Sequence, residues 1–116
     1  MDYFFLGDDE LVTAFRFIGI SGYTVKDPTE AIAVFRKITE GYIDSNYDLP
    51  SSIPASGICQ VLILTEETAD WLCDYMVNWQ LSGKYPLLVE IPGISGKLTG
   101  RKTLVEAIRE AIGLHV

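Results

Sequence analysis

Four short apolar runs alternate along this chain with segments that have the apolar spacing of amphipathic helices. The runs cover residues 3–6, 23–25, 61–64 and 87–91, and the third predicted strand covers about residues 58–64. Strands that run in the same direction need crossover connections, which helices normally supply and which are right-handed in almost every case. The pattern therefore predicts an α/β fold, a four-stranded parallel sheet of order 2-1-3-4 with helices on both faces, which is Rossmann-like or receiver-like.

The clearest helix signal follows the second run. Asp27 has the side chain of an N-cap, Pro28 suits the first helical position, and Glu30 can reach back to the cap. Gly41 suits the left-handed position after the last turn. An earlier helix is predicted to begin at Asp8 or Asp9, where a carboxylate would meet free backbone N–H groups, and to end near residue 18.

A further helix is expected after the third run, with Thr65 as its N-cap. Its core face is predicted to contain Ala69, Leu72, Cys73 and Met76, at helical spacing. A second row lies roughly 110° around the helix from this face. It consists of Trp71, Tyr75 and Trp79. Such a row either packs against a neighbouring helix or forms a partner surface, because Trp and Tyr often anchor protein interfaces.

The rest of the chain divides into loops and one last helix. Residues 42–57 contain turn formers without a clear period, and we expect either a solvated loop or a contact arm. Within a single domain of residues 1–116, residues 1–92 form the sheet core. Residues 93–100, with three glycines, form a flexible connection, and residues 101–116 form a C-terminal helix with apolar Leu104, Ile108 and Ile112.

Charge and composition exclude several classes of function. Sixteen acidic and nine basic side chains give a net charge of −7, which repels nucleic-acid phosphates. The one histidine, His115, argues against a histidine-based metal or catalytic site. Two cysteines without a CxxC pair predict buried free thiols in a reducing compartment. No apolar stretch approaches the roughly 20 residues that cross a bilayer, so we expect a cytoplasmic protein without direct membrane insertion.

The pair Asp8–Asp9 is the strongest candidate for chemistry. Receiver domains hold magnesium with such a pair after the first strand, since carboxylate oxygens suit this ion. They also need an aspartate at the end of the third strand and a lysine after the last one. Here Thr65 and residues 92–93, Pro-Gly, stand at those positions. A helix cap is the favoured interpretation, and a receiver-like signalling module that uses Asp8 and Asp9 with magnesium is the alternative.

Nucleotide binding has less support. The turn at residues 7–10 contains one glycine and three acids, and neither it nor residues 93–96 has the glycine spacing or the lysine of a phosphate-binding loop. We therefore predict no catalytic, cofactor-binding or metal-binding residues and no cofactor. The sequence favours an interaction role. The candidate partner interface consists of Arg16, Trp71, Tyr75, Trp79, Arg101 and Arg109.

Several segments, taken in order, resemble the F subunit of the V-type (archaeal/vacuolar-type) rotary ATPases and ATP synthases. Residues 13–19, Thr-Ala-Phe-Arg-Phe-Ile-Gly, are similar to the family segment T-x-G-F-R-L-A-G, and residues 62–66 match the end of its third strand. Residues 86–93 contain its P-x-x-x-E-I-P pattern. Ala14 stands where the family often has glycine, and Phe17 and Ile18 are bulkier than its usual pair. The resemblance covers nearly the whole chain except about residues 41–57.

The resemblance implies a non-catalytic component of the central stalk. Such a component binds the coiled-coil D subunit, turns with it, and couples ATP turnover to ion transport. It implies further contacts with the catalytic head and with the adaptor subunit of the membrane rotor, and a location peripheral to the membrane. It also implies a hinge at residues 93–100 and a regulatory role for residues 101–116.

Overall fold

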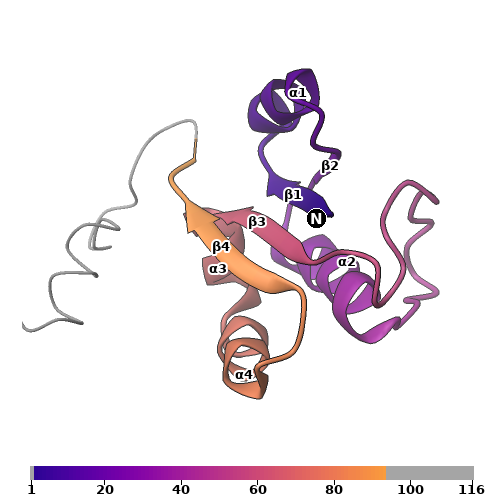
Figure 1. The fold of residues 1–116 in the computed structure, drawn as a ribbon. Coiled ribbons are helices and arrows are strands. Elements are labelled where there is room, and N and C mark those ends of the chain that lie inside the picture. Colours follow the sequence, from indigo (N-terminus) through magenta and orange to yellow (C-terminus); the bar gives the residue numbers. More distant parts are fainter. Residues whose placement is uncertain (1, 94–116) are drawn as a thin grey trace, which may run out of the picture.

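The computed structural model describes residues 2–93, and its centre is a parallel sheet of four strands (Figure 1). The strands are β1 (Tyr3–Gly7), β2 (Gly22–Thr24), β3 (Val61–Thr65) and β4 (Leu87–Ile91). Their order across the sheet is β2-β1-β3-β4, and every neighbouring pair is parallel. The predicted α/β fold, sheet direction and strand order are confirmed.

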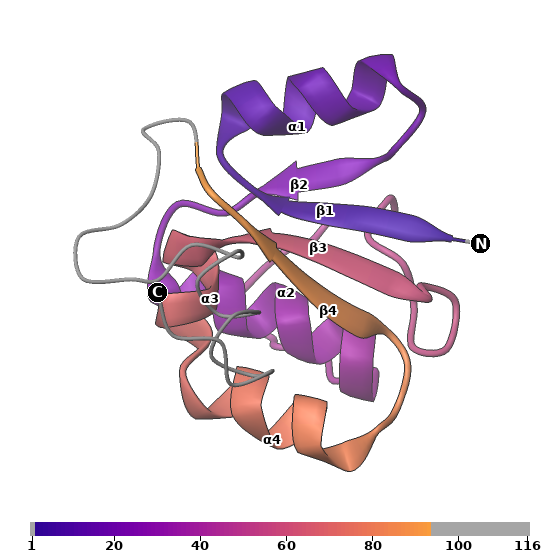
Figure 2. The same ribbon diagram turned by 60° about the vertical axis from the view of Figure 1, so that its left-hand side comes forward.

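Helices lie on both faces of the sheet. Figure 2 shows α1 (Asp9–Phe17) on one face, while α2 (Pro28–Glu40), α3 (Glu66–Leu72) and α4 (Asp74–Ser82) lie on the other. This division follows from right-handed crossovers, because the chain moves from β1 outward to β2 and then back across the sheet to β3 and β4. The face under α2, α3 and α4 is called face B below, and the face under α1 is called face A.

The main hydrophobic core lies on face B. Phe4 and Leu6 of β1 pair with Leu62 and Leu64 of β3, and all four are almost completely buried. They pack in one cluster with apolar residues of the three helices on that face. On face A, Phe5 stacks against Phe15 of α1 with ring centroids 4.6 Å apart. The alternation of side chains along β1 therefore supplies both faces of the sheet.

The ends of α2 follow the sequence prediction closely. Asp27 accepts a hydrogen bond from the backbone N–H of Glu30 at 2.8 Å, as an N-cap does. The Glu30 side chain reaches back as expected, but it accepts from the N–H of Lys26 at 2.9 Å, one residue before the cap. Gly41 closes the helix with φ of 74°, the left-handed conformation that glycine adopts most easily.

The start of α1 differs from the prediction. Asp8 occupies the N-cap position, but its side chain makes no capping hydrogen bond. Asp9 lies within the first turn, and its carboxylate accepts from the hydroxyl of Thr24 at 3.3 Å. Among the residues of this helix only Val12 is fully buried, and Ile18 after it is 71% exposed. The apolar spacing of α1 therefore overstates how much of this helix the sheet covers.

The single helix predicted after Thr65 is in fact two helices. Cys73 has φ of 46° and separates α3 from α4. One residue with positive φ interrupts the helix, yet Ala69, Leu72 and Met76, on its two sides, are buried in the core of face B as predicted. Cys73 was predicted to lie on the core face but is exposed, whereas Cys59 is buried. The prediction of two buried thiols is therefore wrong for one of them.

The segment before β3 is longer and better anchored than the sequence suggested. The strand was expected to begin at residue 58, but Ile58 is 55% exposed and β3 begins at Val61. Within the preceding loop, Ile53 is buried in the core of face B, and its carbonyl accepts from the Lys37 ammonium at 2.9 Å. The loop therefore packs against α2 and is not a fully solvated loop.

Several predictions lie outside the described residues. They concern most of the flexible connection at residues 93–100, the C-terminal helix at residues 101–116, and the candidate interface residues Arg101 and Arg109. The domain division proposed from the sequence therefore remains a prediction.

Candidate interaction surface

The carboxyl edge of the sheet, where open α/β sheets usually bind ligands, is occupied mainly by groups that form turns and caps. At the end of β3, the Thr65 hydroxyl accepts from the backbone N–H of Thr68 at 3.2 Å and lies 2.8 Å from the Thr68 hydroxyl. Thr65 therefore caps α3 as predicted. Within residues 2–93, no three His, Cys, Asp or Glu side chains come together as a metal site would require. Asp8 and Asp9 thus lack a third ligand of this kind in the described part.

The predicted aromatic row separates into two roles. Trp71 and Trp79 are partly buried and pack against the core cluster of face B. The Trp79 indole N–H donates to the carbonyl oxygen of Pro86 at 2.9 Å. Tyr75, one turn before Trp79, is 38% exposed. The row therefore offers one exposed ring and two rings that mainly stabilise the domain.

Tyr75 belongs to an aromatic and cationic surface that the sequence analysis did not identify. The Arg36 guanidinium of α2 lies 3.9 Å from the centre of the Tyr42 ring and 6.0 Å from that of Tyr75. Glu40 forms an ion pair with Arg36 at 2.9 Å and orients it. The hydrogen bond to Glu40 raises the pKa of Arg36. The guanidinium therefore stays charged under all ordinary conditions.

A hollow of about 320 Å³ continues this surface between α2 and α4. Tyr75, Trp79 and Lys84 line it, together with Phe35, Glu40 and Asn78. The Lys84 ammonium lies 5.9 Å from the centre of the Trp79 ring. We call the set Arg36, Tyr42, Tyr75, Trp79 and Lys84 the α2–α4 surface. Its composition of Tyr, Trp and Arg is that of interface hot spots.

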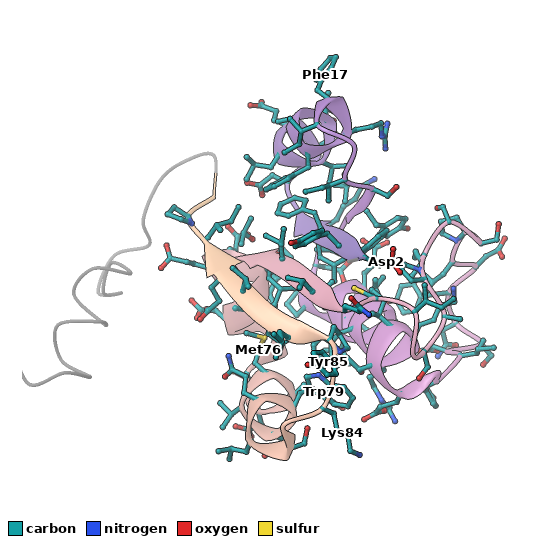
Figure 3. The ribbon with its side chains drawn as sticks, in the orientation of Figure 1. Asp2, Phe17, Met76, Trp79, Lys84 and Tyr85 are labelled. Atoms are coloured by element: carbon teal, nitrogen blue, oxygen red, sulfur yellow. The ribbon has the colours of Figure 1, made fainter. Side chains whose placement is uncertain are left out.

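Arg16 lies elsewhere. It is exposed near the end of α1 and lines a shallow apolar hollow with Thr13 and Phe17. Phe17 is 87% exposed. Figure 3 shows Phe17 at the end of α1, far from Trp79 and Lys84 at the opposite end of the molecule. The structure therefore brings Tyr75 and Trp79 together but places Arg16 apart, so the members of the predicted interface that lie within residues 2–93 do not form one patch.

The sequence offered only a partial signal for the residues that were missed. Arg36 and Glu40 stand four residues apart in a helix, the spacing of an ion pair. The contact of Arg36 with Tyr42, however, depends on the left-handed turn at Gly41. The contact with Tyr75 depends on how α2 lies beside α4. Spacing alone could suggest the pair but not the surface.

Comparison with known proteins agrees with the motifs. No protein-family model matches the chain. No helix within residues 2–93 is long and apolar enough to span a bilayer. The chain is 29% identical over 115 residues to the F subunit of the A-type ATP synthase of Methanothermobacter thermautotrophicus, and the alignment covers 96% of this chain and 92% of the relative. The chain is thus related along nearly its whole length to the F subunit of an ATP synthase. This relationship supports the assignment of the chain to the family of V/A-type ATPase F subunits, which its motifs resemble.

Proposed function

We propose that this chain is a non-catalytic rotor component in the central stalk of a V/A-type ATPase or ATP synthase. In this proposal it binds the coiled-coil D subunit and couples ATP turnover in the catalytic head to ion transport in the membrane rotor. It then works on the cytoplasmic side, peripheral to the membrane. Contacts with the catalytic head and with the adaptor subunit of the membrane rotor belong to the same proposal.

One observation carries the proposal, namely the similarity to an ATP synthase F subunit over 96% of the chain. A match of this extent includes the sheet, its helices and their connections, so it does not rest on one short motif. A densely packed sheet also suits a part that transmits torque, because protein interiors are nearly incompressible. Here the paired strands β1 and β3 form the buried centre of that sheet.

We assign the contact with the D subunit to the α2–α4 surface. A coiled coil presents a long ridged side, and the hollow between α2 and α4 can receive a side chain from it. Tyr75 and Tyr42 are exposed there, at 38% and 43%, beside the charged Arg36. Burial of rigid aromatic rings against a partner loses little side-chain entropy, which favours such rings as anchors.

The test is reconstitution with the D subunit of the same ATPase. Both full-length proteins are mixed at low micromolar concentration, and complex formation is followed by size-exclusion chromatography and titration calorimetry. We expect a one-to-one complex. Absence of any complex at micromolar concentration contradicts the proposed function. A complex that forms normally with the Tyr75→Ala variant keeps the function but removes the α2–α4 surface as the contact.

A further inference from the structure

The strand β2 forms one edge of the sheet, beside α1 (Figure 2), and part of its backbone faces outward. The carbonyl of Ser21 and the N–H of Val25 both form hydrogen bonds with β1, at 3.0 and 3.3 Å. Successive residues of a parallel strand direct their backbone groups to opposite sides. The N–H and C=O groups of Gly22 and Thr24 therefore point away from β1, and we call these two residues the open pair.

The N–H groups that flank the open pair are satisfied within the chain. On one side, the Ile20 N–H donates to the carbonyl of Phe15 in α1 at 2.9 Å. On the other side, the Lys26 N–H donates to the Glu30 carboxylate at 2.9 Å. Neither N–H of the open pair donates to another residue within 2–93. The edge is therefore closed at both ends and open over these two residues.

A groove of about 650 Å³, which includes all of β2 in its lining, exposes the open pair. This volume is in the range of sites that hold ligands. Thr13 and Arg16 of α1 line the groove, and so do Lys26 and Glu30. Gly22 places no side chain over the strand, since a Cβ there would lie 2.8 Å from the backbone oxygen of Phe5. Another backbone can therefore approach this edge closely.

Charge is distributed unequally along the groove. At the Thr24 end, the Asp9 carboxylate accepts from the Thr24 hydroxyl at 3.3 Å. Arg16 lies about 10 Å further along α1. Because the end of α1 bonds to the residues just before β2, Arg16 is at the Gly22 end. Arg16 forms no ion pair with any residue in the described part of the chain. The Gly22 end thus carries a positive charge that is available to a ligand.

We propose that the open pair is a strand-addition site for an extended segment of another protein, with an acidic side chain of that segment opposite Arg16. The added strand would extend the sheet by hydrogen bonds to Gly22 and Thr24, the mode in which peptides join exposed sheet edges. Arginine suits an acidic partner because its planar guanidinium can donate two parallel N–H groups to one carboxylate. A second copy of the chain is a poorer ligand, since the net charge of −7 makes two copies repel each other.

This site goes beyond the proposed function, because Arg16 lies far from the α2–α4 surface that is assigned to the coiled-coil partner. It gives Arg16, which the sequence placed in a partner interface, a contact of its own.

Amide NMR of the isotope-labelled, free, full-length chain tests the proposal. The main probe is the capped peptide Val-Thr-Glu-Val-Thr. One control peptide has lysine in place of glutamate, and a second has proline in place of both threonines, which removes backbone donors. We expect the glutamate peptide to shift the amide signals of Gly22 and Thr24 and to saturate at low millimolar concentration. It should bind at least about tenfold more tightly than either control.

Two variants identify the group that recognises the acid. Arg16→Gln should remove the preference for the glutamate peptide over the lysine peptide, while the amide signals of the open pair still shift. Glu10→Gln is the matched control, because Glu10 is exposed on the same helix but does not line the groove, and it should retain the preference.

Other results overturn the proposal. Unshifted signals of Gly22 and Thr24 exclude strand addition, and equal binding of the proline peptide shows that the backbone is not recognised. Equal binding of the glutamate and lysine peptides by the unmodified chain removes Arg16 as the recognition group. Signals that shift when the chain alone is concentrated make a second copy the ligand. Because the measurements use only the free chain and synthetic peptides, their outcome is independent of binding to the D subunit.

Discussion

Trp79 of α4 donates its indole N–H to the carbonyl oxygen of Pro86 at 2.9 Å. This bond joins the end of a helix on face B to the residue that precedes β4. Because Trp79 also packs against the core cluster, its side chain holds the edge strand and the helix together. Tyr75, in the preceding turn, makes no comparable contribution to the core and remains available for a partner.

Replacement of Trp79 should therefore reduce stability. Trp79→Phe keeps an aromatic ring but removes the donor, and a lost hydrogen bond of this kind costs about 0.5–1.5 kcal/mol. For a domain of this size, that corresponds to a fall in Tm of roughly 4–8 °C per kcal/mol. Thermal unfolding followed by circular dichroism measures it. Leu81→Ala, at a position of α4 that is 82% exposed, is the control and should leave the Tm nearly unchanged. An equal Tm for Trp79→Phe and the unmodified chain would contradict this role.

Replacement of Tyr75 should weaken partner binding and leave stability nearly unchanged. Tyr75→Ala removes an exposed ring of the α2–α4 surface, so the Tm should change little while the affinity for the coiled-coil D subunit decreases. Truncation of a hot-spot residue costs about 2 kcal/mol or more, which corresponds to a roughly 30-fold increase in Kd. Titration calorimetry with that partner measures the change, and Leu81→Ala again serves as control. If both variants weaken binding equally, the effect does not come from this surface.

The N-cap of α2 should contribute measurably to stability. Asp27 accepts from the Glu30 N–H at 2.8 Å, and removal of such a cap typically costs about 0.5–2 kcal/mol. Asp27→Ala should therefore lower the free energy of unfolding by this amount in urea titrations. Asp27→Asn retains an acceptor oxygen and should stay within a few tenths of a kcal/mol of the unmodified chain. A similar loss of unfolding free energy in both variants would contradict the capping role and attribute the effect to the negative charge of Asp27.

The two thiols should react at very different rates. Cys73 is exposed, whereas Cys59 is buried, donates its S–H to the Val61 carbonyl at 3.2 Å, and has its pKa raised to about 11 by that burial. Because the thiolate is the reactive form, Ellman's reagent at pH 8 should label one thiol rapidly in the folded protein and the second only after unfolding. Cys73→Ser should abolish the rapid phase. Two rapid equivalents in the native protein would contradict the buried position of Cys59.

The raised pKa of Cys59 also predicts a pH dependence of stability. The folded protein keeps this thiol protonated, while the unfolded chain releases the proton near its ordinary pKa of 9.0. The corresponding stabilisation is fully present below pH 9 and is lost as the pH rises toward about 11. Urea titrations between pH 8 and 11 should show a smaller decline for Cys59→Ala than for the unmodified chain. Parallel declines would show that Cys59 does not contribute.

Local signals along the chain were sufficient for the architecture. Alternating apolar runs and helices dictate parallel strands, since each strand is separated from the next by a crossover, and handedness then leaves few strand orders. Asp27, Gly41 and Thr65 act at the helix ends as predicted because capping involves atoms only a few residues apart. The family resemblance likewise depended on motifs that can be read in order.

Contacts between distant segments could not be read in this way. The break at Cys73, the burial of Ile53 and the contact of Arg36 with both Tyr42 and Tyr75 depend on how separate elements pack together. Sequence spacing reports which residues share a face of a helix, but not whether anything covers that face. The sequence therefore determined the order of the strands and most helix ends, whereas the tertiary structure alone decided which aromatic rings stay exposed, because exposure depends on neighbours from other parts of the chain.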